Sequence, residues 1–498
     1  MTNIQSITSK LKTIFWPIHR SELGKFIPMS ALMFCILFNQ NILRILKDSI
    51  LISEISAEVA SFAKVYCVTP AAALFVIIYA KMVNHLSFVK IYYYLLSFFL
   101  GFFIIFAFII YPNTDIFHTD SASLNRIMLN YPHLKWYIAI VCNWSYIVFY
   151  TLSELWPNIF YILLFWQFAN EITTTEEAKR FYTFFSLFGN SSLIVVGFLM
   201  MNLSSEQTFA KYFFNITNSK ITLVQVSTIF VIISSILSCL LVRFLSHKIF
   251  IDHKFSVSPK DLTVDNHKNI GILKSFKYIA KSKYLWLMVV CSAAFGCSIN
   301  LVEAVWKAKI KELYPTVNSY AEFNGLYILW TGVTIIVMTI IGNNIMRNHN
   351  WFIAAIISPI IIMVTGIMFF VLVVFDTQIL SLFDHIIIIS PLVIAVSVGA
   401  IQNILAKGTK YSIWDSSMQM LYIPLDKELR TKGKAAVDVV SSKFGKSSSG
   451  LLQSVIFTVI PTATFTSISP ILMVMFTIIC ILWIYAIRKI YFEYQKIV

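Results

Sequence analysis

Charged residues are scarce in this chain, and that scarcity excludes an ordinary soluble fold. Only 13% of the 498 residues are Asp, Glu, Lys or Arg, whereas 58% are hydrophobic. Soluble domains carry about 25% charged residues. The composition therefore predicts a protein that crosses a membrane many times. Among the few charges, basic residues exceed acidic ones, 39 against 24, which gives a formal net charge of +15.

The sequence also lacks the motifs of common catalytic and metal sites. It has no His-Glu-x-x-His, no Gly-x-Ser-x-Gly and no Cys–His metal spacing, and its seven cysteines lie in or beside apolar runs. Phe444-Gly-Lys-Ser447 is similar to the end of a P-loop, but Val440 occupies the position where that motif needs glycine. We therefore expect neither an enzyme nor an ATP-driven pump, and no metal or cofactor.

Apolar runs of spanning length recur through the whole chain. A spanning helix needs about 20 apolar residues. The runs predict twelve spans at 26–46, 59–80, 91–111, 137–169, 181–203, 222–245, 284–303, 324–345, 353–375, 386–424, 436–459 and 468–489. We expect an all-α membrane protein with an N-terminal six-helix half (26–245), a basic linker (246–283), a C-terminal six-helix half (284–489) and end segments at 1–25 and 490–498. The fourth and tenth runs exceed one perpendicular span, so each should extend beyond the bilayer or break.

Lysine and arginine are distributed unevenly between the two sides of these spans. Most of those outside the spans fall on the side that holds both chain ends, and few fall in the opposite loops, which include Lys307, Lys309 and Lys311. Because basic residues concentrate in cytoplasmic loops, both termini are predicted to be cytoplasmic. The same bias explains the net charge without nucleic acid as a partner. The first 25 residues contain no apolar core of a signal peptide, so we expect no cleavage.

The two halves carry traces of an internal repeat. A shift of 256 residues aligns Ser186–Ser192 with Ser442–Ser448. The same shift superimposes buried charges of opposite sign, in the pairs Lys47 with Glu303 and Glu154 with Lys410. The matches are few, and chance similarity between apolar helices is the alternative interpretation.

Charged residues inside the spans are the main candidates for function, since each costs roughly 2.5–3.5 kcal/mol at the centre of a spanning helix on insertion scales. The basic ones are Arg44, Lys47, Lys64, Lys407, Lys410, Lys443 and Lys446, and the acidic ones are Asp48, Glu154, Glu303 and Asp415. The positive excess predicts an anionic ligand. Several of the basic residues are spaced i, i+3 on one helix face, where phosphates or carboxylates can offset their repulsion.

Some of these residues also have structural interpretations. Lys64 is expected to extend its side chain to a membrane interface. Glu154 can lock two helices through an ion pair and still take part in gating. The aromatic residues Trp156, Tyr411 and Trp414 either stack on a nucleobase or pack in the core. Hydropathy alone places Lys47 and Glu303 near the outer mouth, whereas Glu154, Lys410 and Lys446 lie nearer mid-span.

Six separated blocks of sequence give a more specific indication. They are Leu43-Arg-Ile-Leu-Lys-Asp48, Glu154-Leu-Trp156, Leu164-Phe-Trp-Gln-Phe-Ala-Asn-Glu-Ile-Thr173, Asn300-Leu-Val-Glu-Ala-Val-Trp-Lys307, Tyr422-Ile-Pro-Leu-Asp426 and Lys443-Phe-Gly-Lys-Ser447. Through them the chain resembles the bacterial and plastid ATP/ADP translocase family over nearly its whole length. The resemblance implies a twelve-helix fold like that of the major facilitator class. By motif position it implicates Lys47, Glu154, Glu303 and Lys446 in transport. To these the buried charges add Lys410, Arg44 and Asp415.

The resemblance implies a nucleotide antiporter in the inner membrane of an intracellular bacterium, surrounded by lipid, that exchanges host ATP for bacterial ADP by alternating access. Two departures leave the nucleotide open, so GTP/GDP, CTP and UTP remain alternatives. The family's exchangers usually read F-G-K-S-G-G where this chain has Phe444-Gly-Lys-Ser-Ser-Ser-Gly450, and usually have glycine where this chain has Pro157. A proton-coupled organic-anion facilitator and a non-transporting membrane scaffold are the alternatives from other classes.

Overall fold

The structure is a computed structural model that describes residues 18–205, 219–251, 282–376, 378, 390–425 and 434–496. Throughout these ranges the regular elements are helical, which confirms the predicted all-α fold. Elements of the N-terminal part are η1 (Arg20–Glu22), α2 (Leu23–Glu54), α3 (Ala57–Phe62), η2 (Ala63–Val68), α4 (Thr69–His85), α5 (Phe88–Ile105), η3 (Phe106–Ile110), η4 (Tyr111–Asn113), α6 (Thr114–Phe117), α7 (Ser121–Asn130), η5 (Pro132–Leu134), α8 (Lys135–Cys142), α9 (Trp144–Trp156), η6 (Pro157–Phe165), α10 (Trp166–Ile172), α11 (Thr175–Ser204) and α13 (Ser219–Ile251). Those of the C-terminal part are α15 (Lys283–Leu313), α16 (Val317–Asn348), α17 (Trp351–Val374), α19 (Pro391–Thr409), η7 (Lys410–Trp414), α20 (Asp415–Met420), α21 (Lys434–Val459) and α22 (Phe465–Gln495).

The helices agree with the predicted spans. Within the described ranges, 11 helical segments are long and apolar enough to cross a membrane. The one predicted span not among these, the eleventh at 436–459, coincides with α21, whose residues Ser448–Val459 form a shorter apolar helix. The division at the linker stays a prediction, because most of 246–283 lies outside the described residues.

The two overlong predicted spans are irregular in different ways. The fourth breaks at Asn143, a residue with φ −109° and ψ 39° that separates α8 from α9. It then passes through η6, a π-helical stretch that begins at Pro157. The tenth contains the shorter π-helical stretch η7, which begins at Lys410. Proline at 157 supplies no backbone N–H, which favours the wider turn there.

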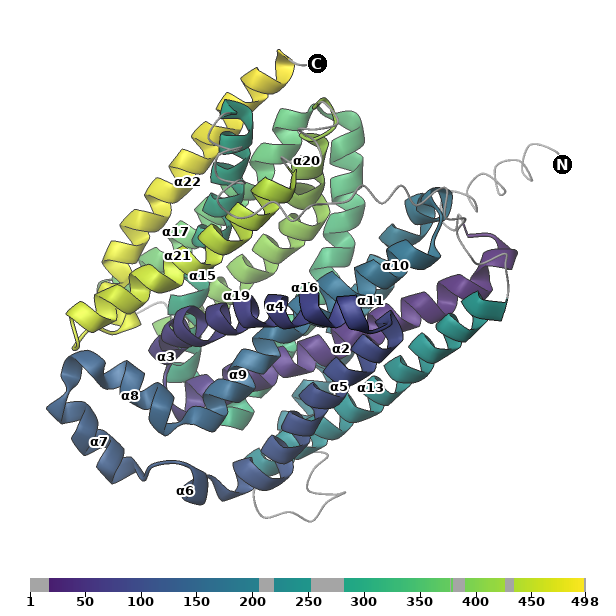
Figure 1. The fold of residues 1–498 in the computed structure, drawn as a ribbon. Coiled ribbons are helices and arrows are strands. Elements are labelled where there is room, and N and C mark those ends of the chain that lie inside the picture. The colour runs from purple at the N-terminus through teal and green to yellow at the C-terminus, as the bar shows by residue number, and fades with distance from the viewer. Residues whose placement is uncertain are drawn as a thin grey trace.

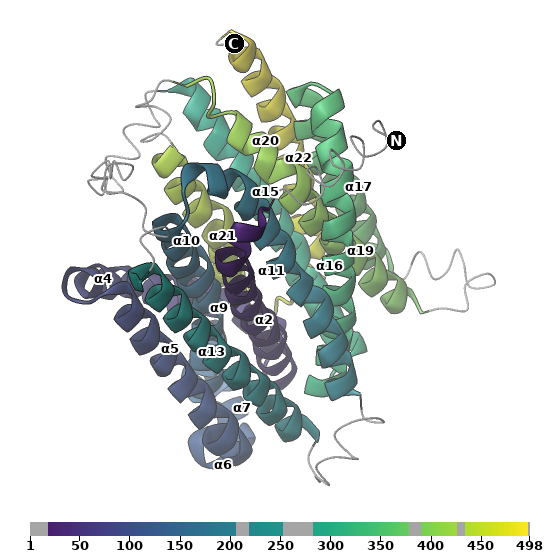
Figure 2. The same ribbon diagram turned by 90° about the vertical axis from the view of Figure 1, so that its right-hand side faces the viewer.

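The N-terminal and C-terminal helices form two groups that meet at the lower left of Figure 1. In the first group α2 packs against α9, α11 and α13, and in the second α15 packs against α19, α21 and α22. Figure 2 shows α2, α11 and α16 side by side, and the contacts between α11 and α16 join the two groups. Each group thus places one long helix, α2 or α15, beside the other group.

Glycine allows α11 and α16 to approach closely. A Cβ atom on Gly197 would lie 2.7 Å from the backbone oxygen of Gly325, and one on Gly325 would lie 2.9 Å from the backbone nitrogen of Met201. Small residues at helix crossings in membranes let backbones pack tightly. The close crossing joins the two groups through α11 and α16.

The end of the seventh predicted span was wrong. The prediction stopped at 303 and placed Lys307 and Lys309 in an outer loop, whereas α15 continues to Leu313 and buries both side chains. The helix continues because each lysine has a carboxylate within reach: Lys307 pairs with Glu303, and Lys309 with Glu312. Hydropathy averages cannot register that pairing.

Candidate functional site

Two of the predicted site residues form an ion pair between separate helices: Lys47 on α2 and Glu154 on α9. Lys47 is 4% exposed, and its Nζ lies 2.7 Å from a carboxylate oxygen of Glu154. It also donates to Asp48 at 2.8 Å, and its Nζ lies 4.5 Å from the centre of the Tyr150 ring. Lys47 and Glu154 are therefore at the same depth, although hydropathy had separated them.

Lys307 connects the N-terminal group to the C-terminal group. Its Nζ, on α15, lies 2.8 Å from Asp48 on α2 and 3.2 Å from Glu303, one turn earlier on α15. Both Lys307 and Asp48 are buried, with 7% and 4% of their surface exposed. A buried ion pair of this kind makes each partner dependent on the other, since an unpaired charge in the interior is costly.

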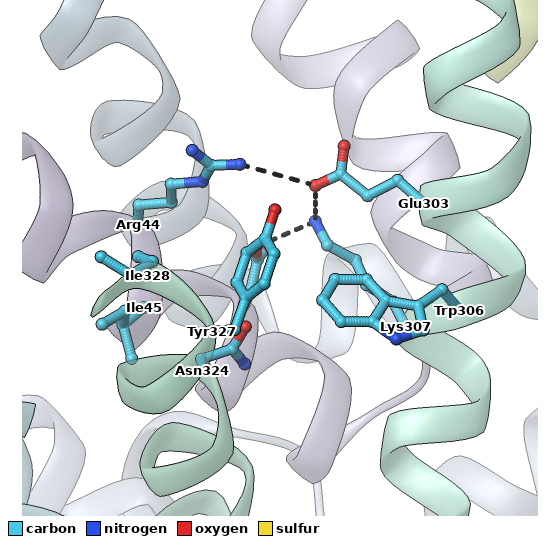
Figure 3. A pocket seen from close by; sticks show the side chains of 9 residues that line it. Arg44, Ile45, Glu303, Trp306, Lys307, Asn324, Tyr327 and Ile328 are labelled. Carbon is cyan, nitrogen blue, oxygen red and sulfur yellow. Dashed lines mark ion pairs between the residues drawn. The ribbon is translucent and has the colours of Figure 1, made fainter. Parts of the chain in front are cut away.

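Arg44 reaches the same carboxylate from the opposite side. One guanidinium nitrogen lies 3.8 Å from Glu303, and Figure 3 shows Arg44 and Lys307 converging on that residue with Tyr327 between them. These side chains line a narrow pocket with about 10 Å³ of free space, together with Ile45, Asp48, Trp306, Asn324 and Ile328. That space is about enough for one water molecule. A larger anion can enter only when the surrounding side chains move apart.

Two further lysines face the cluster. Lys407 on α19 donates to the Tyr327 hydroxyl, and its Nζ lies 4.7 Å from the centre of that ring. Lys64 on η2 is half-buried and lies within electrostatic range of Glu303 and Glu154. The interpretation of Lys64 as a residue at the membrane interface stays a prediction.

The described cluster thus combines five basic side chains with three carboxylates. The basic residues are Arg44, Lys47, Lys64, Lys307 and Lys407, and the acidic ones are Asp48, Glu154 and Glu303. The surplus of positive charge in a low-dielectric interior favours a bound anion. The cluster lies between α2, α9, α15, α16 and α19.

The remaining predicted residues either lie away from this cluster or have side chains that the structure does not describe. Lys410 pairs with Asp415 at 2.9 Å on its own helical segment, and its Nζ lies 4.4 Å from the centre of the Tyr411 ring. The structure does not bring this pair into contact with the carboxylates of the cluster. Lys446 belongs to α21, but its side chain, like that of Lys443, lies outside the described residues.

Two of the aromatic candidates are core residues. Trp156 is 1% exposed and donates its indole N–H to the backbone oxygen of Ile36. Trp414 is 3% exposed and packs against Phe295 and Trp483. Tyr411 differs, since 50% of its surface is exposed. Packing therefore explains both tryptophans and leaves Tyr411 as the candidate for stacking.

Lys307 is the residue of the cluster that sequence reasoning missed. The signal was present, because Glu303 and Lys307 have the i, i+4 spacing of a helical ion pair. It also ends one of the sequence blocks of the resemblance. The apolar run stops before it, so hydropathy assigned it to a loop.

Two solved structures of bacterial transporters share the fold of this chain. The chain has a TM-score of 0.60 to a bacterial homologue of the iron transporter ferroportin in an inward-facing state, with 11% identity over 94% of this chain and 100% of that one. It has a TM-score of 0.52 to the nucleoside transporter NupG, with 12% identity over 93% and 98% of the two chains. These likenesses concern the fold, which is that of a major-facilitator-like transporter.

The sequence comparisons then identify the family. The sequence model of the TLC ATP/ADP transporter family matches residues 1–494. An ADP,ATP carrier protein 5 of Rickettsia bellii is 73% identical over 98% of both chains, and one of Rickettsia felis is 73% identical over 100% of this chain and 99% of the other. An ADP,ATP carrier protein 3 of Rickettsia prowazekii is 42% identical over 98% of both chains. The chain belongs to the TLC ATP/ADP transporter family, which confirms the resemblance.

Proposed function

We propose that this multi-pass membrane protein exchanges host ATP for bacterial ADP across the inner membrane of a bacterium by alternating access. The observation that carries the proposal is the match to ADP,ATP carrier proteins over nearly the full length of both chains. The surplus of basic side chains around Glu303 supplies the chemistry for binding phosphates. Nucleotides and the surrounding lipid are then its partners.

The predicted residues take distinct roles in this proposal. Lys47, Lys410 and Lys446 contact phosphate oxygens at successive stages of transport. Glu154 and Glu303 neutralise basic side chains when no nucleotide is bound, as Glu154 does for Lys47 at 2.7 Å. A nucleotide phosphate replaces these carboxylates as the partner of the lysines, so binding changes which helices are held together. Arg44 and Asp415 hold Glu303 and Lys410 in place.

Contacts between the two groups support alternation. They lie close to the connection at 55–56 between α2 and α3. Lys311 donates to the backbone oxygen of Ile55 at 2.7 Å, and Ser61 donates to Gln453 at 2.7 Å. The backbone N–H of Phe465 donates to Glu58 at 3.2 Å. With both termini cytoplasmic, as the sequence predicts, this end faces outward. The molecule is then closed on the outside.

Uptake by vesicles tests the proposal. Purified protein in liposomes should accumulate labelled ATP when the vesicles are preloaded with ADP, and should take up little ATP into empty vesicles. Exchange of labelled GTP, CTP or UTP in place of ATP would move the substrate to another nucleotide. If the protein shows a cooperative thermal unfolding transition, and is therefore folded, but transports no nucleotide, the proposal is excluded.

A further inference from the structure

The C-terminal end of α21 is capped by side chains from the other group of helices. The last carbonyl oxygens of a helix have no donor within that helix. Beside Val459, where α21 ends, His133 donates through Nδ1 to the backbone oxygen of Thr458 at 2.8 Å. Lys135 donates through Nζ to the backbone oxygen of Pro461. Because a carbonyl oxygen only accepts, Nδ1 of His133 carries the proton in this contact.

Both donors belong to a segment that leaves the N-terminal group between the third and fourth predicted spans. We call residues 114–136, which comprise α6, α7, η5 and the start of α8, the outer strap. Figure 1 shows α7 and α8 beside the lower end of α21, and η5 contacts α21. Directly after the strap, the Tyr137 ring packs 5.1 Å from that of Phe62 on α3. The strap is thus anchored on the N-terminal group and reaches the C-terminal group.

These two hydrogen bonds can form and break reversibly. His133 is exposed and Lys135 is half-buried, so water replaces both donors and both carbonyl oxygens when the groups separate. While the contact lasts, the ammonium group of Lys135 also lies at the negative end of the α21 dipole, which stabilises the closed arrangement. Such contacts favour one arrangement of the two groups without making it permanent.

We propose that His133 and Lys135 form a latch that holds the C-terminal end of α21 against the N-terminal group and releases it each time this end opens. The inference rests on the proposed function and deepens it, because alternating access requires such an opening. The hydrogen bond between Ser61 and Gln453 joins the same helix to α3 further inside. The latch acts on the helix that carries Lys446, a predicted transport residue.

Distances across this end of the molecule measure the latch directly. Spin labels at Ile116 on α6 and Glu322 on α16, both exposed, report the separation of the two groups. They are introduced as I116C/E322C into full-length protein without the seven native cysteines. K135M should raise the ratio of open to closed molecules about tenfold, a change that corresponds to about 1.4 kcal/mol. H133A should raise the same ratio several-fold, because it removes the other capping bond.

Two further variants are the controls. K135R keeps the charge and the donors, so it should retain the distances of the unaltered protein. R126Q removes an exposed charge on α7, within the same strap, and should also leave the distances unchanged. Each variant must show a cooperative thermal unfolding transition. If K135M folds poorly, H133A tests the same latch through its separate bond to Thr458.

Uptake of external ATP by intact cells that express the protein is the second readout. A nucleotide that binds from outside requires the open arrangement, so its apparent affinity rises with the open fraction. K135M should therefore lower the half-saturating concentration of external ATP several-fold. A substitution that only destabilised the fold would lower the maximal rate and leave that concentration unchanged.

The results separate the latch from the proposed function. Unchanged distances in both K135M and H133A, or an equal shift in R126Q, would overturn the latch while nucleotide exchange continued. Longer distances in K135M and H133A, in a protein that exchanged no nucleotide, would support the latch and exclude the proposed function.

Discussion

At the scale of single residues, the cluster depends on Lys307. Its ammonium group forms ion pairs with both Asp48 on α2 and Glu303 on α15. Breaking a buried ion pair by removing one partner typically costs about 3–5 kcal/mol, because the other charge is left uncompensated. Lys307 therefore supports both the stability of the molecule and the geometry around Glu303.

Substitution of Lys307 by Met tests this dependence. K307M should lower the free energy of unfolding by about 3–5 kcal/mol, since Asp48 keeps only Lys47 and Glu303 keeps only the distant Arg44. Removing the second charge as well, in D48N/K307M, should recover part of the loss, and the double-mutant cycle measures that coupling. Thermal and denaturant unfolding in detergent provide the values.

An exposed ion pair on the same helix provides the control for K307M. Lys283 pairs with Glu493 at 2.8 Å, but 69% of its side chain is exposed. Exposed ion pairs contribute little to stability because water screens them, so K283M should unfold almost like the unaltered protein. If K307M were equally mild, the buried pairs would have little structural importance.

At the scale of helices, hydropathy predicts the positions of the spanning helices well but predicts their breaks and their ends poorly. A run of apolar residues locates a span because the bilayer core has a fixed thickness. It cannot show where α9 begins after the break at Asn143, nor that α15 continues past Glu303. Both features depend on contacts with other helices. The individual charges Arg44, Lys47, Glu154 and Glu303 were predictable, since any charge at that depth needs a partner, but the choice of partner requires the fold.

The glycine contact between α11 and α16 is an element-scale feature that a single substitution can test. G325L should destabilise the protein by about 1–3 kcal/mol, because the added side chain meets the backbone of α11 around Met201 and forces the helices apart. G101L is the matched control, since a Cβ at Gly101 meets nothing within 4 Å. Unfolding midpoints that drop equally for both variants would argue against a close crossing.

At the scale of the whole molecule, the two groups of helices are not equivalent. The repeat predicts that the pair Lys47–Glu154 should have a counterpart between Glu303 and Lys410. The first pair forms at 2.7 Å, whereas Glu303 pairs with Lys307 and Lys410 pairs with Asp415. The ion pairs therefore do not follow the 256-residue shift, because each group also responds to the other across the site.

A disulfide across the contacts between the two groups tests whether these contacts must open during transport. Ser61 and Gln453 come from different groups and lie 2.7 Å apart at their side-chain oxygens. In a variant without the seven native cysteines, S61C/Q453C should form a disulfide under mild oxidation and lose nucleotide exchange, and reductant should restore it. Alternating access requires this end to open once in each cycle, so a covalent bond there stops the cycle.

A second cysteine pair within one group is the control that gives the result its meaning. Asn39 on α2 and Ser235 on α13 are hydrogen-bonded at 2.9 Å, and both belong to the N-terminal group. N39C/S235C should also cross-link, yet exchange should continue, because the group moves as a unit relative to its neighbour. If exchange continued in oxidised S61C/Q453C, the contacts at this end would not be a gate. If exchange stopped in both oxidised pairs, motion inside the N-terminal group would have to be part of the cycle.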